Sequence, residues 1–356
     1  MLRSFSPSFQ KSTILFLCLS FLFTLLPGCA LATTSCNTEQ ELKDVIIYNS
    51  SQLAEEYTLQ ISPPLWDKIS ANEFAYLSEI LLNCGVPSYA YSYEPTQRII
   101  TISDPQYMPG MKVAICAKNG WTNRLDQQER KLLQTATKLV QQSTKGSQSD
   151  YDIIRALHDA LIQKTNYTFF SPDQDNAIGA LLNGAADCDG YADAFYLLCS
   201  LAGYDVYFQF GYSNTNSAEA HMWNGIRVND AIYMVDVTWD DPDSYYNLFF
   251  YGFMLMGNDM ARSAYNWNPE TAIFTPSPVT NPSLYYYFRN DCAFQSAKEA
   301  ASYIRLHDQT DPLFLMISYP PFTDENSILS ELKDEKIAGV FQWQSCDGFL
   351  FICFSK

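Results

Sequence analysis

Apolar and polar positions along the chain follow three successive patterns, which predict three structural zones. In the first zone, residues 38–104, apolar residues recur at helical spacing and then alternate as they do in strands. The predicted order is helix, strand, helix, strand, strand, over residues 39–56, 57–62, 72–85, 88–93 and 98–103. The first zone is therefore expected to be one small α/β unit.

The central zone, residues 120–275, opens with two helical patterns around 132–140 and 153–161. A third helix is predicted to begin at Cys188 and to end at Gly203, a typical helix stop. Its buried stripe comprises Ala192, Phe195, Cys199 and Ala202. The pattern favours a larger central domain in which this helix packs on strands.

Two strands follow that helix, at 221–228 and 231–239, and they flank an Asn-Asp turn at 229 and 230. This arrangement predicts an antiparallel hairpin. Residues whose numbers add up to about 459 are then paired, so Asp236 is expected opposite position 223 and within diagonal reach of His221.

The last zone, residues 285–356, repeats the order of the first: helix, strand, helix, strand, strand. Both outer units follow their first strand with a similar phrase, ISPP at 61–64 and ISYPP at 317–321. Duplication of one ancestor and convergence on a common α/β unit are equal alternatives, because a proline pair after a strand is ordinary turn chemistry. Duplication predicts the same strand order in both sheets.

Alternate aromatic residues mark one face of a strand in each outer unit. They are Tyr89, Tyr91 and Tyr93 in the first unit, and Phe341 and Trp343 in the last. Because residues two apart share a face of a strand, each set is either core or a contact surface, and we interpret both as core.

The first 32 residues have the pattern of a signal peptide. Arg3 and Lys11 precede an apolar run at 14–26 that is short for a membrane span, which predicts export. The sequence LPGC favours lipidation at Cys29 and a cell-surface lipoprotein, with membrane contact only through the lipid. The alternative is ordinary secretion after cleavage near ALA at 30–32.

Composition and charge restrict the classes of partner. The chain has 356 residues, 47% of them hydrophobic and only 17% charged, which indicates a folded protein. Its formal net charge of −17 argues against nucleic-acid binding, because that function requires basic patches. The ten cysteines are scattered rather than arranged in a disulfide framework, so buried thiols are expected.

Cys188 is the candidate nucleophile. A helix N-terminus stabilises the thiolate, which is the reactive form of cysteine, through unpaired N–H groups and the helix dipole. Gly190, in the first turn, is expected to admit another backbone or an acyl substrate close to the helix.

His221 is the candidate base among the three histidines, because the hairpin brings Asp236 close to it. Asp236 would orient the imidazole, which completes the arrangement that nucleophilic catalysis requires.

These three segments resemble the core motifs of the bacterial exported transglutaminase-like proteins. The matching stretches are LLNGAADCDGYADAFYLLCSLAGY, HMWNGIRV and YMVDVTWDDP, and they cover roughly residues 128–260. The resemblance implies an α+β, papain-like fold with a Cys188–His221–Asp236 triad and chemistry on amide bonds, by acyl transfer to an amine or to water. Asp187 stands where an apolar residue is typical, and its carboxylate is expected to oppose thiolate formation.

Several alternatives are weighed beside the triad. A zinc site at Cys188, His221 and Asp236 lacks the paired ligand spacing of strong zinc motifs, so neither a metal nor another cofactor is expected. The run DDPD at 240–243 is read as a solvated turn in preference to a calcium site.

Tyr167, Tyr191 and Trp223 are candidates for an apolar substrate wall, with core as the alternative for each. The function expected from the sequence is a peptidase, amidase or acyltransferase on protein or cell-wall peptides. The alternative is a non-catalytic surface binding protein that retains the fold.

Overall fold

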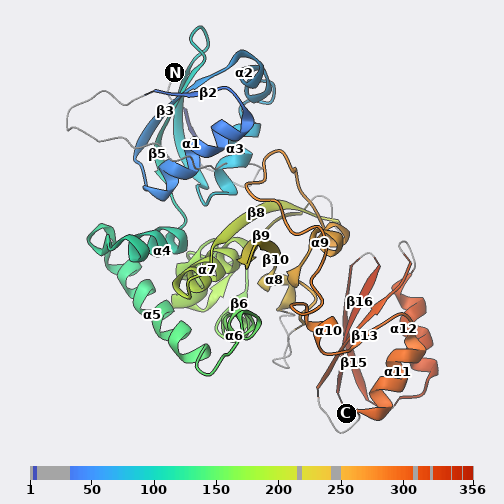
Figure 1. Ribbon diagram of the computed structural model, residues 1–356. Helices are drawn as coiled ribbons and strands as arrows, with labels where there is room; N and C mark the ends of the chain where they lie inside the picture. The colour runs from blue at the N-terminus through green and yellow to red at the C-terminus, as the bar shows by residue number, and fades with distance from the viewer. Residues whose placement is uncertain are drawn as a thin grey trace.

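The computed structural model describes residues 3–5, 33–214, 219–241, 250–307, 312–320, 324–337, 339–346 and 348–355 (Figure 1). Most of the predicted signal peptide, including Cys29, and parts of the predicted DDPD and ISYPP stretches lie outside these residues. Within the described part, no helix has the length and apolar character that crossing a membrane requires.

The fold is α+β, with a central unit between two smaller ones (Figure 1). The first unit contains β1 (Arg3–Phe5), β2 (Thr34–Cys36), α1 (Glu39–Ser51), β3 (Glu56–Ile61), α2 (Pro63–Ser70), α3 (Ala75–Leu82), β4 (Ser88–Glu94) and β5 (Ile99–Gln106). Its sheet has the order β1-β4-β5-β3-β2 and its own buried core. The sequence missed β2, and it missed α2 because the proline pair was read as a turn. Proline is favoured in the first turn of a helix, where its missing N–H has no partner to lose.

The central unit places a group of helices against an antiparallel sheet (Figure 1). The helices are α4 (Pro109–Asn119), α5 (Gln127–Ser143), α6 (Asp150–Ile162) and α7 (Cys188–Leu201). The sheet has the order β11-β10-β9-β8-β12, with β8 (Val206–Ser213), β9 (Ala220–Val228), β10 (Ala231–Val235), β11 (Met254–Met256) and β12 (Tyr265–Asn266). Shorter elements are β6 (Asn166–Tyr167), β7 (Ala185–Ala186), α8 (Val237–Asp240) and α9 (Asn258–Ala264).

Helix α4, which the sequence did not predict, fixes the entry to the central unit. The carboxylate of Asp193 on α7 accepts hydrogen bonds from the backbone N–H groups of Gly110 (2.7 Å) and Met111 (3.0 Å) in the first turn of α4. Asp193 is fully buried and also accepts from the N–H of Ala177 at 2.9 Å. One side chain therefore satisfies three backbone donors and holds α4 and the loop at Ala177 against the helix of Cys188.

The last unit contains α10 (Tyr286–Arg289), β13 (Ala293–Phe294), α11 (Ala297–Leu306), β14 (Leu313–Ser318), α12 (Glu325–Asp334), β15 (Val340–Cys346) and β16 (Phe349–Ser355). Its buried residues belong to the same core as those of the central unit. Phe351 shows the connection, since its ring lies 5.5 Å from those of Phe253 and Tyr287. The last unit is therefore packed firmly on the central one.

Four strands in each outer sheet share one order. Counted from the parallel pair, the order is β2-β3-β5-β4 in the first unit and β13-β14-β16-β15 in the last, with antiparallel pairs after the first pair. Ile61 and Ile317, which begin the two similar phrases, lie opposite Cys36 and Phe294 on the parallel neighbour. The expected common strand order is confirmed, and descent from one ancestor stays a prediction.

The aromatic faces of the outer units are largely core, as expected. Tyr89 and Tyr91 are buried, and Tyr93 packs against the same core. In the last unit Phe341 contacts Phe354 at 5.1 Å, whereas Trp343 on the edge strand β15 is 47% exposed. Only Trp343 of this set is left for external contacts.

Candidate functional site

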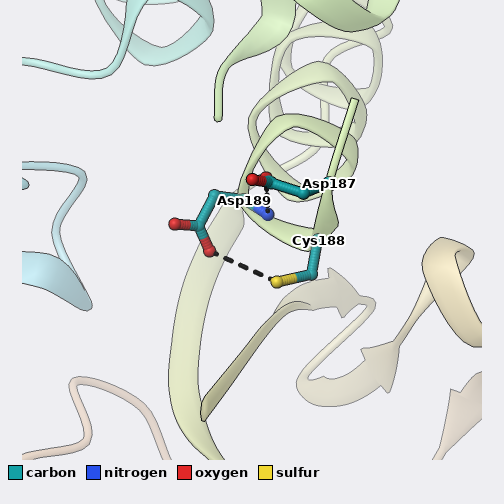
Figure 2. Close-up of side chains that lie close together, drawn as sticks. All are labelled: Asp187, Cys188 and Asp189. Carbon is teal, nitrogen blue, oxygen red and sulfur yellow. Dashed lines mark hydrogen bonds between the residues drawn. The ribbon is translucent and has the colours of Figure 1, made fainter. Parts of the chain in front are cut away.

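Helix α7 begins at Cys188, as predicted. Its N-cap is Asp187, whose Oδ1 accepts hydrogen bonds from the N–H groups of Asp189 (3.1 Å) and Gly190 (3.4 Å). Aspartate is a favoured N-cap because it satisfies the orphan donors of the first turn. The Cys188 side chain leaves the helix at this end and is partly exposed (Figure 2).

Gly190 has a different role from the one expected for a substrate approach. A Cβ at this position would lie 2.2 Å from the carbonyl oxygen of Gln174 and 2.7 Å from the Cβ of Ala186. The glycine therefore admits a loop of the same chain, which was the other sequence-based expectation. That loop, at Gln174, also accepts the backbone N–H of Asp187 at 2.9 Å and so supports the start of α7.

The hairpin of β9 and β10 has the predicted register. Ala231 pairs with Val228 and Val235 with Asn224, and Asn229 adopts a positive φ of 53° in the turn. Asp236 follows β10 directly, and its Oδ2 accepts the His221 Nε2–H at 2.6 Å. The predicted contact of His221 with Asp236 is confirmed.

The strand predicted to run to position 239 ends earlier, because α8 starts at Val237. Asp236 is the N-cap of this short helix and accepts the backbone N–H of Trp239 through Oδ1 at 3.2 Å. Oδ2 also accepts the Tyr265 hydroxyl at 2.6 Å. With His221, three donors hold a carboxylate that is only 1% exposed.

Aromatic rings enclose the imidazole of His221, which is 4% exposed. Tyr265 stacks on it at a centroid distance of 5.9 Å, and Trp223 and Trp239 lie at 6.0 and 5.2 Å. Because Nε2 is bound to Asp236, Nδ1 is the nitrogen that remains for proton exchange with a nucleophile. The enclosure excludes water and strengthens the bond to Asp236.

The resting thiol of Cys188 bonds to Asp189 rather than to His221 in the described residues, with 3.6 Å between Sγ and Asp189 Oδ1 (Figure 2). Burial raises the pKa of Cys188 well above its usual value, and the charges of Asp189 and Asp187 raise it further. A backbone hydrogen bond from Met222, the neighbour of His221, acts in the opposite direction. The thiol is therefore protonated at rest, as the acidic residue at 187 led us to expect.

The two flanking carboxyl groups are perturbed as well. Burial, together with the charge of Asp189, raises the pKa of Asp187 to about 7. Burial likewise raises the pKa of Asp189 to about 6, which the nearby Cys188 and His221 oppose. Mild acidification therefore removes negative charge from the surroundings of the thiol.

We expect Asp189→Asn to increase the reactivity of Cys188. Loss of the Asp189 charge lowers the pKa of the thiol, and a shift of about one unit corresponds to roughly tenfold more thiolate near neutral pH. The measurement is the rate of alkylation by iodoacetamide, located at Cys188 by peptide mass. Asp205→Asn is the matched control, because that carboxylate is 59% exposed and pairs with Arg227. An unchanged rate in Asp189→Asn contradicts the electrostatic account.

Two of the three substrate-wall candidates are core residues. Trp223 is 1% exposed and stacks on Tyr265 at 4.4 Å, and Tyr191 is 1% exposed with its hydroxyl bound to the carbonyl oxygen of Thr165 at 3.0 Å. Tyr167 is partly exposed and pairs with Ala186, two residues before Cys188. Burial raises the pKa of Tyr167, and the charge of Cys188 raises it further. Its ring contacts Phe169, which is 49% exposed.

The cysteines and the acidic residues around Cys188 bear on the alternatives of disulfide and metal bonding. In the described part, Cys36, Cys116, Cys188, Cys199 and Cys292 are free thiols. Donor atoms of Asp187, Cys188 and Asp189 lie within 4.8 Å of one another, but these side chains already bind backbone N–H groups or each other (Figure 2). In the DDPD run, Asp240 is buried against His158 and Asp241 bonds to Tyr191, so neither is solvated as predicted.

Sequence reasoning missed three groups of this site. Tyr265 lies 29 residues from Asp236 on a different strand, and no local pattern connects them. The hydrogen bond from the Trp239 N–H to Asp236 was missed because residues 231–239 were predicted to form a strand. An Asp followed by a helical turn is nevertheless an N-cap signal. Asp189 was visible as a charge beside Cys188 but was not assigned to the thiol.

Comparison with known proteins adds a family match. Residues 137–239 match the model of the transglutaminase-like superfamily. A search of curated proteins returned no match.

Three solved structures show remote likeness. One is a TGase, at 11% identity and a TM-score of 0.28, covering 51% of this chain and 50% of the other. A protein of Cytophaga hutchinsonii named as a candidate cysteine protease is 12% identical, with a TM-score of 0.27. The match covers 42% of this chain and 60% of the other. The periplasmic domain of TgpA from Pseudomonas aeruginosa, bound to ethylmercury, is 20% identical, with a TM-score of 0.26. The match covers 40% of this chain and 55% of the other.

This chain thus spans between half and three fifths of these three proteins, and the assignment rests on the family match. The matched segment contains Cys188, His221 and Asp236 on the helix and hairpin described above. Residues 137–239 of the central unit therefore carry a domain of the transglutaminase-like superfamily.

Proposed function

We propose that the protein is an exported thiol enzyme that acts on amide bonds through an acyl-thioester of Cys188. The observation that carries this proposal is the buried hydrogen bond of 2.6 Å between His221 and Asp236, with a cysteine at a helix N-terminus beside the same strand. A carboxylate that fixes the imidazole leaves its second nitrogen available as a general base.

In the proposed acylation step, His221 Nδ1 takes the proton of the Cys188 thiol as the sulfur attacks the amide carbon. The backbone N–H of Cys188 is the candidate donor to the developing oxyanion. His221 then returns the proton to the leaving amine, the C–N bond breaks, and a thioester remains. Water or a primary amine attacks the thioester carbon while His221 accepts its proton. The C–S bond then breaks, and His221 returns the proton to the sulfur. This step releases the acid or the new amide and restores the thiol.

The raised pKa of Cys188 determines how this step begins. An enzyme whose thiol is protonated at rest needs proton transfer concerted with attack, rather than a stored thiolate–imidazolium pair. The same observation favours the second candidate function, a non-catalytic surface binding protein that retains the fold. The complete His221–Asp236 pair supports the enzyme over the binding protein.

The surface near Cys188 supports one class of substrate. Tyr167 and Phe169 offer an apolar wall next to the thiol, and Phe170 is 95% exposed beside them. We infer protein or peptide substrates with an apolar side chain near the reacting amide, on cell-surface protein or wall peptide. Export and a lipid anchor at Cys29 remain part of this proposal, with no role for nucleic acid.

The test is incubation of the protein with a peptide library, with and without a primary amine, and analysis of products by mass. Hydrolysis products alone define a peptidase or amidase, and amine adducts define an acyltransferase. Cys188→Ala is the control for both. Absence of products from the wild-type protein over a broad library favours the binding protein instead.

A further inference from the structure

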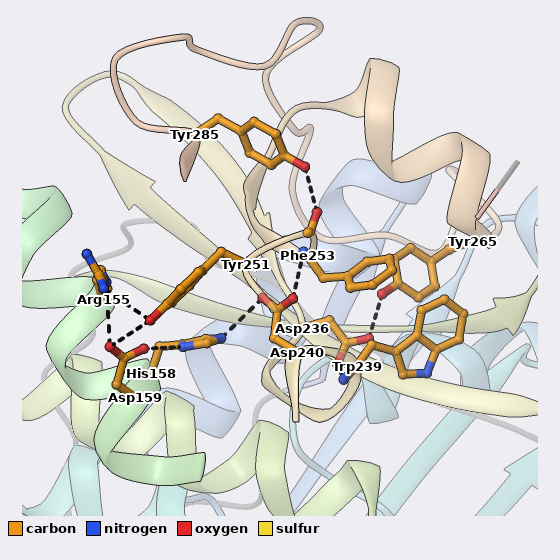
Figure 3. A network of polar contacts seen from close by, with 11 residues as sticks. Arg155, His158, Asp159, Asp236, Trp239, Asp240, Tyr251, Phe253, Tyr265 and Tyr285 are labelled. Atoms are coloured by element: carbon orange, nitrogen blue, oxygen red, sulfur yellow. Dashed lines mark hydrogen bonds and ion pairs between the residues drawn. The ribbon is translucent and has the colours of Figure 1, made fainter. Parts of the chain in front are cut away.

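Beyond the triad, α6 carries a second histidine, His158, which lies between the carboxyl groups of Asp159 and Asp240 (Figure 3). His158 has no exposed surface, and its Nδ1 lies 2.9 Å from Asp159 Oδ1 while its Nε2 lies 3.2 Å from Asp240 Oδ2. Ionised carboxylates only accept hydrogen bonds, so with both carboxyl groups ionised both ring nitrogens donate and the ring is an imidazolium.

The protonation state of His158 agrees with this geometry. Burial lowers the pKa of His158, but hydrogen bonds and charge from Asp159 and Asp240 outweigh burial and raise the pKa to about 9. Burial raises the pKa of Asp240 to about 7, against the effect of His158. A buried charged pair of this kind is costly unless further hydrogen bonds satisfy its polar groups.

Asp240 also forms hydrogen bonds with the segment that precedes β11 in the chain. Its Oδ1 accepts the N–H of Phe253 at 3.0 Å, and its carbonyl accepts the N–H of Phe250 at 3.1 Å. The carbonyl of Phe253 in turn accepts the N–H of Asp236 at 2.9 Å. A continuous series of hydrogen bonds therefore leads from His158 through Asp240 and Phe253 to the residue that orients His221.

The same segment is held from its other side by the last unit (Figure 3). The Tyr285 hydroxyl donates to the carbonyl of Gly252 at 2.9 Å, and Tyr251 stacks on Tyr286 at 4.3 Å. The Tyr251 hydroxyl donates to Asp159 Oδ2 at 3.2 Å and accepts from Arg155 at 3.1 Å. The segment at 250–253 thus lies between the His158 network and the last unit.

We propose that His158 is a positioning residue for this active site, which acts through Asp240 and the Phe253 backbone to keep Asp236 aligned with His221. The catalytic part of this inference rests on the proposed function, whereas the alignment of Asp236 does not. The contact that matters is the one from His158 Nε2 to Asp240, and the contact from Nδ1 to Asp159 stabilises the fold.

A pair of variants separates these two contacts. The amide nitrogen of His158→Gln occupies the place of Nε2 and keeps a donor to Asp240, whereas that of His158→Asn occupies the place of Nδ1 and keeps a donor only to Asp159. Both variants lose the charge. His307→Asn is the control, because His307 is an exposed histidine at the end of α11.

The first readout is the exchange rate of the His221 proton shared with Asp236, measured by NMR without any substrate. With three histidines in the chain, each ring is assigned by its loss in one variant. We expect faster exchange in His158→Asn than in His158→Gln, and wild-type exchange in His307→Asn. Equal exchange in the two His158 variants overturns the proposal.

Where a substrate is known, the second readout is the division between kcat and KM. His158→Asn is expected to lower kcat on the order of tenfold to a hundredfold with little change in KM, because misalignment affects the reacting groups and not binding. A loss shared equally with His158→Gln overturns the proposal. If the protein turns over no substrate, the proposed function is contradicted but the positioning role of His158 is not, because the NMR measurement does not need a substrate.

Should His158→Asn fail to fold, variants of Asp240 test the next hydrogen bond of the series, the one from the Phe253 N–H. Asp240→Asn keeps an acceptor for the Phe253 N–H, whereas Asp240→Ala removes it. We expect the His221 proton to exchange faster in Asp240→Ala than in Asp240→Asn. Identical exchange in these two variants overturns the proposal.

Discussion

Replacement of Cys188 by Ala is expected to abolish turnover, with a loss of at least about 10,000-fold in kcat, because no thioester can form without the sulfur. The fold should be retained, since Cys188 is partly exposed and its helix is capped by the side chain of Asp187. The measurement is product formation on a peptide substrate, with circular dichroism of the same sample.

Cys199→Ala is the matched control for this variant. Cys199 lies on the same helix, but it is fully buried in the core and burial raises the pKa of its thiol well above the usual value. Its replacement should lower stability by leaving a small cavity and should leave turnover in place. Full activity in Cys188→Ala would move the nucleophile to another residue or favour the binding protein.

The part of the site that sequence reasoning reached is local in the chain. The turn at 229 and 230 fixes the register of β9 and β10, and that register brings Asp236 to His221. The capped start of α7 is also written locally, in Asp187 and the residues after it. Both predictions needed only elements that are neighbours along the sequence.

The missed parts depend on segments that arrive from far along the chain. Trp223 shares a strand face with His221, yet its burial follows from the rings of Tyr265 and Trp267, which cover that face. The period of a strand shows which residues share a face but not what covers it. Strands β2 and β13 are three and two residues long, too short to show any alternation.

The outer units illustrate the same limit. Their longer helices and strands were visible in the sequence, whereas α2, β2 and β13 were not, and the common strand order follows from the structure. The packing of the last unit on the segment at 250–253 was not visible, because Tyr285 and Phe351 make those contacts across long intervals. Through these contacts the last unit supports the residues behind Asp236.

Replacement of Asp236 by Asn is expected to lower kcat by about 1,000-fold to 10,000-fold, although Asn has the same shape. Oδ1 accepts the fixed N–H of Trp239, so the amide oxygen takes that place and the NH2 group faces His221. Nε2 of His221 must then accept a hydrogen bond from this NH2 group, which puts the ring proton on Nδ1. A protonated Nδ1 cannot take a proton from Cys188. In the other orientation of the amide, its NH2 group faces the Trp239 N–H. Two donors then face each other, which lowers stability instead.

Asp236→Ala separates orientation from stability. It leaves the donors of His221, Trp239 and Tyr265 unpaired in a site that is 1% exposed, at about 1–3 kcal/mol for each unpaired group. We therefore expect Asp236→Ala to lower the free energy of unfolding by about 3–5 kcal/mol, more than Asp236→Asn, as measured by urea denaturation. Tyr265→Phe is the matched control, because it removes one donor to Oδ2 and keeps the His221 bond, so its loss of kcat should be much smaller than that of Asp236→Asn. Activity of Asp236→Asn within tenfold of wild type would contradict the role of Asp236 in fixing the proton on Nε2 of His221.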